Sequence, residues 1–98
     1  MLNKIPEDSE VINNIRENRF ELMLGDKKAI IEYTLLKEEK RILLNHTEVP
    51  PEFSGQGIAG RLAKKAFDYA REENLRVTSF CSYIDTYIAR HPELKDLL

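Results

Sequence analysis

The residues best suited to chemistry in this chain lie in a glycine-rich segment, Ser54-Gly55-Gln56-Gly57-Ile58-Ala59-Gly60. The segment follows an apolar run over residues 41–49 and opens an amphipathic stretch with helical spacing. Glycines let bare backbone approach a ligand, and the first amides of a helix have no partner within the helix. The helix dipole adds roughly half a positive charge at the same end. The pattern therefore predicts a binding site for the phosphate or diphosphate group of a ligand.

Two further side chains could take part in a reaction. Cys81 is the single cysteine and falls between a predicted strand and a predicted helix, where a helix N-terminus would lower the pKa of its thiol. The alternative for Cys81 is a small buried core residue, the usual role of a lone cysteine. His46 could act as a general base or be a structural histidine. Strand alternation places it on the same face as Leu44 and Glu48.

Tyrosines four residues apart, Tyr83 and Tyr87, share one face of the last predicted helix. Either could protonate a leaving group, although such a pair more often packs against a core or its rim. His91 is interpreted as a helix-end residue. Lys64 and Lys65 are interpreted as a solvated helix face that could also meet a ligand phosphate.

Length and composition limit the classes of protein that fit. The 98 residues, of which 42% are hydrophobic, fit a single domain over 1–98, and we expect the polar residues 1–9 to fray. A net charge of −2 without a long basic run argues against nonspecific nucleic-acid binding. No segment approaches the ~20 apolar residues of a membrane span, and no signal peptide is recognisable. We expect a cytoplasmic protein without a disulfide, a metal or a membrane partner.

Hydrophobic periodicity predicts an antiparallel meander followed by a β-α-β crossover with a parallel strand pair and a C-terminal helix, an α+β fold. The predicted strands are Val11-Ile12, Arg19–Leu24, Ala29–Leu36, Arg41–Val49 and Leu75–Cys81. The predicted helices run over about Gly57–Glu73 and Ser82–Arg90, with a further turn possible over Glu93–Leu98. A short helix capped by Asp8 is an alternative to the first strand.

Two common phosphate-binding folds fit poorly. Residues 55–60 match G-x-G-x-x-G, but a dinucleotide fold needs an acidic residue about 20 positions later, where this chain has Phe80-Cys81-Ser82. The 38 residues after Gly60 are also too few for a doubly wound sheet. A Walker loop needs Gly-Lys followed by Ser or Thr, which the chain lacks.

The remaining pattern resembles the GNAT acyltransferases, specifically the minimal, single-domain YjdJ-type subfamily. The resemblance covers roughly Arg19 to Glu93, and its carriers are His46-Thr47-Glu48-Val49-Pro50, Gly55-Gln56-Gly57-Ile58-Ala59, Ala70-Arg71, Cys81, Tyr87-Ile88 and Arg90-His91-Pro92. The loop pattern of that family is Arg/Gln-x-x-Gly-x-Gly/Ala, which Gly57 and Ala59 match. Ser54 departs from it at the first position, which removes a side chain but no backbone donor.

The resemblance implies acetyl-coenzyme A, or coenzyme A, as cosubstrate. Its diphosphate would be held by residues 54–60, and its pantetheine arm would lie in a V-shaped slot between the strands that end at Val49 and Cys81. Glu48 and Val49 would complete the coenzyme site, with the Val49 amide polarising the thioester carbonyl. The resemblance also makes Cys81 a candidate acceptor of the acyl group. It ranks Tyr87 above Tyr83 as the residue that would protonate the leaving coenzyme thiolate.

Three functions follow as alternatives. The first is transfer of an acetyl group from acetyl-coenzyme A to an unidentified amine, and the second is a module that binds the coenzyme with little or no turnover. A structural protein with a vestigial loop fits least, because Gly57 and Ala59 are intact. The turns over 25–28 and 37–40 leave no room for the helices that build an acceptor pocket in larger members. We therefore expect an acceptor site that is open, incomplete or completed by another subunit, and an open site suits a protein or peptide amine or slow turnover. The choice between a small-molecule and a protein or peptide acceptor stays open, as does the oligomeric state.

Overall fold

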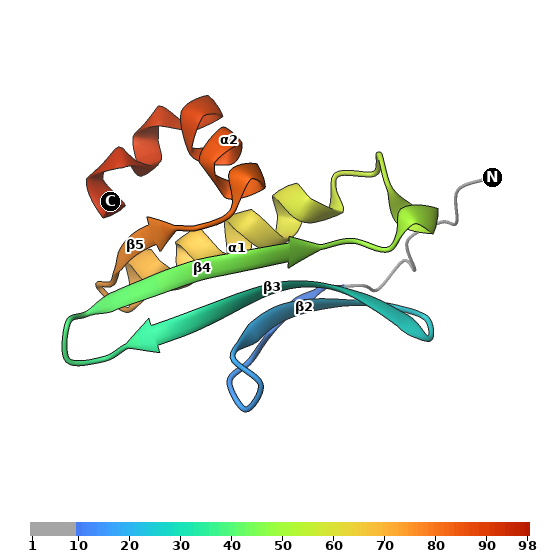
Figure 1. Ribbon diagram of the computed structural model, residues 1–98, viewed down its shortest axis with the longest axis horizontal. Helices are drawn as coiled ribbons and strands as arrows, with labels where there is room; N and C mark the ends of the chain where they lie inside the picture. Colours follow the sequence, from blue (N-terminus) through green and yellow to red (C-terminus); the bar gives the residue numbers. More distant parts are fainter. Residues whose placement is uncertain (1–9) are drawn as a thin grey trace.

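The computed structural model describes residues 10–98 (Figure 1), so the expectation for residues 1–9 lies outside the described part. The strands are β1 (Val11–Asn14), β2 (Arg19–Leu24), β3 (Lys27–Leu36), β4 (Arg41–Glu48) and β5 (Arg76–Ser79). The helices are α1 (Ile58–Glu72) and α2 (Ser82–Arg90), with short 3₁₀ segments η1 (Pro51–Phe53) and η2 (Pro92–Leu97). A strand therefore begins at Val11, where a helix capped by Asp8 was the alternative.

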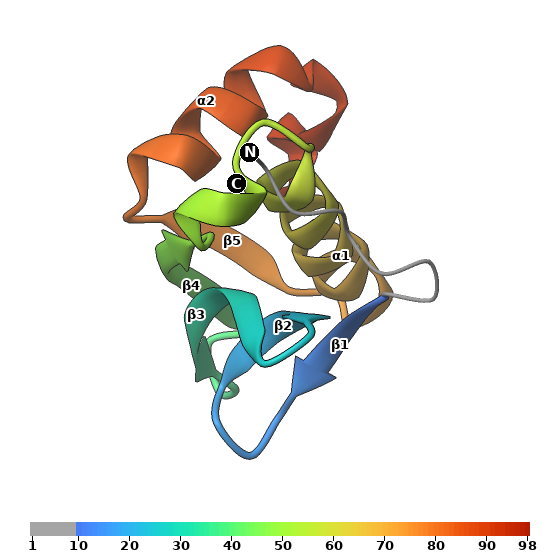
Figure 2. The same cartoon turned by 90° about the vertical axis from the view of Figure 1, so that its right-hand side faces the viewer.

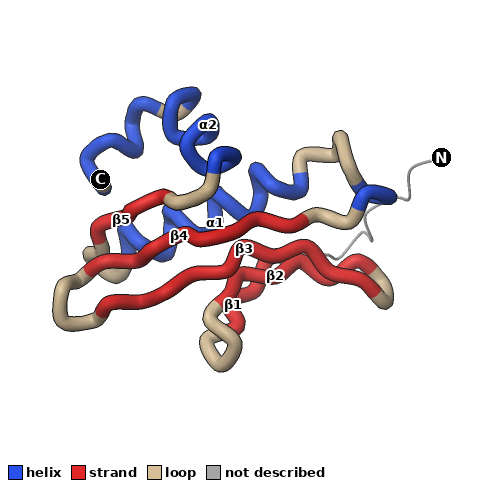
Figure 3. Tube along the Cα trace, viewed as in Figure 1, coloured by secondary structure: helices blue, strands red, loops and turns tan. Residues whose placement is uncertain are grey.

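The strands form one sheet in the order β1-β2-β3-β4-β5, antiparallel throughout except for the parallel pair β4–β5. Helix α1 makes the crossover between these two strands and runs along one face of the sheet (Figure 2). Helix α2 lies beside β5 and α1, so both helices occupy the same side of the strands (Figure 3). This arrangement confirms the predicted meander, crossover and C-terminal helix.

The hairpin between β2 and β3 is tighter than predicted. Leu24 pairs with Lys27, so the turn contains only Gly25 and Asp26, and β3 begins two residues before Ala29. Gly25 has φ of 71°, a left-handed conformation that glycine adopts at little cost. Because the turn is this short, the chain inserts no helix between β2 and β3.

The core lies between α1 and the sheet. Helix α1 places its apolar stripe, which includes the fully buried Leu62 and Phe67, against the inner face of β2, β3 and β4. The helix ends at Glu72, and Asn74 beyond its cap has a φ of 57°, which allows Leu75 N–H to donate to the Ala70 carbonyl at 2.8 Å. This Schellman-type ending aims the chain directly into β5. Ile84 is the buried residue by which α2 joins the same core.

One irregularity in β4 decides which side chains face the helices. Tyr33 pairs with Leu44 and Glu32 pairs with His46, so Asn45 is an extra residue that forms a β-bulge. Leu44 is fully buried on the inner face, whereas His46 is exposed on the outer face. The expectation that His46 shares a face with Leu44 was therefore wrong, because the bulge resets the alternation and moves Thr47 to the inner face.

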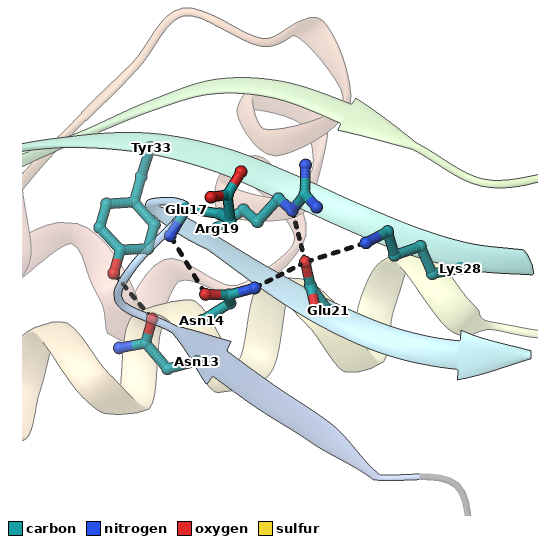
Figure 4. A network of polar contacts seen from close by, with 7 residues as sticks. All are labelled: Asn13, Asn14, Glu17, Arg19, Glu21, Lys28 and Tyr33. Atoms are coloured by element: carbon teal, nitrogen blue, oxygen red, sulfur yellow. Dashed lines mark hydrogen bonds and ion pairs between the residues drawn. The ribbon is translucent and has the colours of Figure 1, made fainter.

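No helix of the described region covers the outer face, yet one carboxylate there is buried. Glu21 is only 4% exposed, and its Oε2 accepts hydrogen bonds from Asn14 Nδ2 at 3.1 Å and from Arg19 (Figure 4). Lys28 Nζ lies 3.5 Å from the same oxygen. These hydrogen bonds stabilise a charge that would otherwise be costly to bury. The network therefore ties β1, β2 and β3 together on the side away from the helices.

Candidate functional site

A gap opens at the edge of the sheet where β4 and β5 part. Their pairing runs from Arg41–Arg76 to Leu44–Ser79, and Phe80 N–H still donates to the Leu44 carbonyl at 2.9 Å. Beyond that point β4 continues to Glu48, whereas the segment after β5 turns away from β4 into α2. The predicted strand over 75–81 is thus shorter in the structure, because its end leaves the sheet.

The backbone of β4 faces this gap beyond the bulge. The Leu44 carbonyl points toward β5, and backbone groups of alternate residues along a strand point to the same side. Since a bulge directs two successive residues, Asn45 and His46, at the same partner, the next groups on the β5 side belong to Thr47 and Val49. The Val49 amide is therefore available to a group that enters the gap, whereas the Thr47 amide faces the Cys81 sulfur.

The glycine-rich loop lies at the far end of the same edge. Gly55 and Gly57 have φ of 78° and 76°, and Gly57 caps α1 without a side-chain hydrogen bond. A Cβ added at either glycine would meet no atom within 4 Å, so the backbone is bare on its open side. The start of α1 is therefore uncovered, which is the feature on which the phosphate-binding prediction rests.

A cavity of about 270 Å³ lies against this loop. Its lining consists of Val49, Phe53, Ser54, Gly55, Gly57, Ile58, Ala59, Gly60 and Tyr83. Seven of these are residues that the sequence predicted for the coenzyme, and the predicted Glu48 and Gln56 do not line it. Small-molecule pockets typically measure about 300–1,000 Å³, so this cavity suits one part of an extended ligand.

Cys81 is held at the start of α2, as its place in the sequence predicted. It is the N-cap residue of the helix, and its carbonyl accepts a hydrogen bond from Asp85 N–H at 3.0 Å. Ser79 Oγ accepts from the Cys81 amide at 3.2 Å and donates to the Cys81 carbonyl at 3.0 Å. The sulfur lies 3.4 Å from Thr47 Oγ1, across the gap.

The surroundings of Cys81 favour its thiolate. Burial acts to raise the pKa, but hydrogen bonding from the Thr47 side chain and from the amides of Ile84, Tyr83 and Thr47 outweighs it. The pKa of Cys81 therefore lies below its ordinary value. Tyr83 and Ile84 are in the first turn of α2, where amides have no partner within the helix.

His46 does not point toward Cys81. Its ring is 56% exposed on the outer face, and Nε2 lies 3.4 Å from Glu48 Oε2. Thr47, between them in sequence, contacts the sulfur instead. The His46-Thr47-Glu48 segment was recognised as a carrier of the family resemblance, but nothing in the sequence indicated a role for Thr47. Its contact depends on the bulge at Asn45, which periodicity does not reveal.

The two tyrosines of α2 differ in position. Tyr83 lines the cavity at the glycine loop, and its hydroxyl would lie 3.6 Å from a Cβ added at Gly60. Tyr87, one turn further along, stacks between Phe67 and His91, with centroid separations of 5.9 and 4.0 Å. Burial is the main cause that raises the pKa of Tyr87. Tyr83 thus lines the cavity at the glycine loop, and Tyr87 lines a second cavity of about 320 Å³ that shares Gly60 and Tyr83 with it.

Other predicted groups lie away from the gap. Lys64 Nζ pairs with Asp68 Oδ2 at 2.8 Å on an exposed helix face, and Lys65 is exposed on the same helix. His91 Nδ1 lies 2.8 Å from the Tyr87 carbonyl, which agrees with a helix-end role. Residues 10–98 contain no group of three or more His, Cys, Asp or Glu side chains that could hold a metal ion. Within the same range, no helix is long and apolar enough to span a membrane.

Comparisons with known proteins agree with this geometry. Residues 19–97 match the family model described as GCN5-related N-acetyl-transferase. The chain is 42% identical over 65 residues to Protein NATD1 of Xenopus tropicalis, covering 66% of this chain and 59% of that protein. It is 48% identical over 54 residues to Protein NATD1 of Homo sapiens, covering 54% and 48%. The chain thus spans about half the length of these relatives.

A solved structure is similar over nearly the whole chain. It is the NMR solution structure of a GCN5-like protein from Staphylococcus aureus, which is 26% identical. The superposition has a TM-score of 0.72 and covers 94% of this chain and 89% of that one. The similarity therefore includes both helices as well as the five-stranded sheet.

Proposed function

Because this chain belongs to the GCN5-related N-acetyltransferase family, we propose that it transfers an acetyl group from acetyl-coenzyme A to an amine. The observation that carries the proposal is the gap beside β4, which has the bare glycine loop at one end and the Cys81 thiol at the other. An extended ligand with a diphosphate in its middle and a thioester at its tip matches these two ends.

The residues of the gap have distinct tasks in this proposal. The free amides at the start of α1, beyond Gly57, hold the diphosphate. The pantetheine arm lies along the edge of β4 that β5 has left, where it takes the place of a neighbouring strand. The Val49 amide donates to the thioester carbonyl and stabilises the negative charge that develops on its oxygen. A donor in such a position is typically worth about 3–4 kcal/mol of barrier.

Cys81 then serves as a covalent relay. Its sulfur attacks the thioester carbonyl carbon, a new C–S bond forms, and the bond to the coenzyme sulfur breaks. The coenzyme sulfur leaves with the electron pair and takes up a proton. The acceptor amine next attacks the Cys81 thioester, an amide bond forms, and the Cys81 sulfur leaves as a thiolate. The amine nitrogen gives its proton to solvent, because His46 lies on the outer face of the sheet, away from the thiol.

A coenzyme-binding module with little turnover is the alternative. It is favoured by the short turns of the meander, two residues between β2 and β3 and four between β3 and β4, which insert no helix that could wall an acceptor pocket. The same openness suits an acceptor amine on a protein or peptide, which brings its own surface. The two functions share the coenzyme site and differ in whether an added amine releases coenzyme thiol.

The test uses two glycines of nearly equal backbone strain. Gly57 and Gly25 have φ of 76° and 71°, so Gly57→Ala and Gly25→Ala should each cost about 1–2 kcal/mol of stability. Coenzyme A should raise the Tm of the wild type and of Gly25→Ala by mass action. The increase should be much smaller in Gly57→Ala. No increase in the wild type, or equal increases in both variants, would contradict the proposed site.

Turnover is tested separately. Acetyl-coenzyme A with an amine should release free thiol, and acetyl-coenzyme A alone should add about 42 Da to the protein but not to Cys81→Ala. Coenzyme binding without amine-dependent release would support the binding module. Release that survives in Cys81→Ala would indicate direct attack of the amine on the thioester.

A further inference from the structure

The β-bulge in β4 brings a residue to the reactive thiol that no part of the proposed reaction has yet used. Thr47 points to the inner face because the extra residue Asn45 resets the alternation of the strand. Its Oγ1 lies 3.4 Å from Cys81 Sγ, and the two residues are separated by 34 positions in the chain. Both are half-buried, and they lie on opposite sides of the gap.

This contact spans the gap beyond the last backbone hydrogen bond between β4 and the segment that follows β5. Phe80 N–H to the Leu44 carbonyl closes the regular pairing, and Thr47 is three residues further along β4. Thr47 presents both its hydroxyl and its amide to the sulfur. Since a thiolate can only accept hydrogen bonds, the hydroxyl must donate when Cys81 is ionised.

We propose that Thr47 is the positioning residue of Cys81, whose hydroxyl donates to the sulfur and holds the thiolate at the mouth of the gap. The inference rests on the proposed function, because it assigns Thr47 a task in the covalent relay. The Cys81 thiol gives its proton to solvent, and the Thr47 O–H then donates to the sulfur. When the sulfur bonds to the acetyl carbon its charge is neutralised, so the hydrogen bond weakens as the step proceeds.

The effect of Thr47 on the titration of Cys81 can be distinguished from the effects of the neighbouring titratable groups. On β4, His46 and Glu48 lie on the outer face, away from the thiol. On α2, Tyr83 and Asp85 are in the first turn. Thr47 itself does not titrate at ordinary pH. Its loss should therefore shift the titration curve of Cys81 without adding or removing another titration.

The experiment measures the rate of alkylation of Cys81 by iodoacetamide as a function of pH. Cys81 is the only cysteine, so every labelled thiol reports on this site. Hydrogen bonds to charged groups are roughly twice as strong as those between neutral groups, and a shift of one pKa unit changes the thiolate fraction about tenfold at a pH well below the pKa. Thr47→Val should therefore raise the thiol pKa by about one unit or more, with roughly tenfold slower labelling at neutral pH. The plateau rate at high pH should stay the same, because the thiolate remains accessible.

Matched variants separate positioning from packing. Thr47→Ser keeps the hydroxyl, so the pH dependence of its Cys81 alkylation should match that of the wild type. Thr47→Val is nearly isosteric with threonine but cannot donate a hydrogen bond to the sulfur. Thr86→Val removes a hydroxyl of α2 that bonds only to the Ser82 carbonyl, at 3.2 Å, and should leave the curve unchanged. An unshifted curve in Thr47→Val, or equal shifts in the serine and valine variants, would overturn the inference.

A second measurement separates this inference from the proposed function. The alkylation rate needs neither coenzyme nor amine, so it decides the role of Thr47 at the thiol by itself. The pH profile of acetyl loading from acetyl-coenzyme A, followed by intact mass, should shift in Thr47→Val by the same amount as the alkylation profile. Failure of the wild type to load would refute the covalent relay, whatever the alkylation curves show. Loading with an unshifted profile in Thr47→Val would overturn the positioning role.

Discussion

Replacement of Glu21 by glutamine should lower the free energy of unfolding at neutral pH by about 1–2 kcal/mol. The carboxylate is 4% exposed and receives hydrogen bonds from Asn14 and Arg19. A hydrogen bond to a charged group contributes about 1.5–3 kcal/mol, against about 0.5–1.5 for a neutral pair, and glutamine keeps only the neutral part. Lys28, at 3.5 Å and with a side chain 40% exposed, should add little.

The effect should depend on pH with a definite sign. Burial acts to raise the pKa of Glu21, but hydrogen bonds from Arg19 and Asn14 and the charge of Lys28 together bring it below its ordinary value of 4.5. The unfolded chain therefore binds the proton at a higher pH than the folded chain. The stabilisation is fully present above about pH 4.5 and is lost as the pH falls through the folded-state pKa. The difference in free energy of unfolding between the wild type and Glu21→Gln should therefore become smaller as the pH falls below about 4.5.

Thermal unfolding followed by circular dichroism, from neutral pH to about pH 3, measures both effects. In a domain of this size 1 kcal/mol shifts Tm by about 4–8 °C, so Glu21→Gln should melt roughly 5–15 °C lower at neutral pH. Glu39→Gln, in the exposed β3–β4 turn, serves as the control and should melt like the wild type. A neutral-pH Tm equal to that of the wild type would refute the reasoning, as would a difference that stays constant in acid.

Variants at two further positions test how the site is supported. Ile84 is fully buried, so Ile84→Ala should lower the free energy of unfolding in urea by about 2–5 kcal/mol; a loss well below that range would show that α2 contributes little to the core. Asn74 has φ of 57° at the end of α1, so Asn74→Ala should cost about 1–2 kcal/mol and Asn74→Gly much less. Equal Tm values for the two Asn74 variants would contradict this account of the helix end.

The sequence was sufficient for the fold and for the glycine loop. Alternation in β2 and β3, the proline stop at Pro50-Pro51 and helical spacing over 58–72 are local signals, and each corresponds to an element of the structure. The parallel placement of β5 follows from the helical crossover between two strands. The open loop was recognisable because Gly55 and Gly57 precede an amphipathic stretch, and both adopt positive φ in the structure.

The side of β4 that faces Cys81 could not be predicted in the same way. A bulge adds one residue without a distinctive residue type, so Asn45 looked like an ordinary strand position and His46 was placed on the wrong face. The extent of β5 also depends on the divergence from β4, a long-range property. The position of Tyr83 at the cavity follows from the packing of α2 on α1, which helical spacing alone does not set.

The single extra residue in β4 shapes the strand where it leaves β5, because a bulge bends the strand that carries it and increases its local twist. A deletion of one codon at Asn45 would leave His46 opposite Glu32 and Thr47 opposite Ile31, so both side chains would keep their present faces. The deletion would instead remove the local bend and change the course of β4 past Cys81. The width of this edge therefore depends on chain length, whereas the residue that meets the sulfur does not.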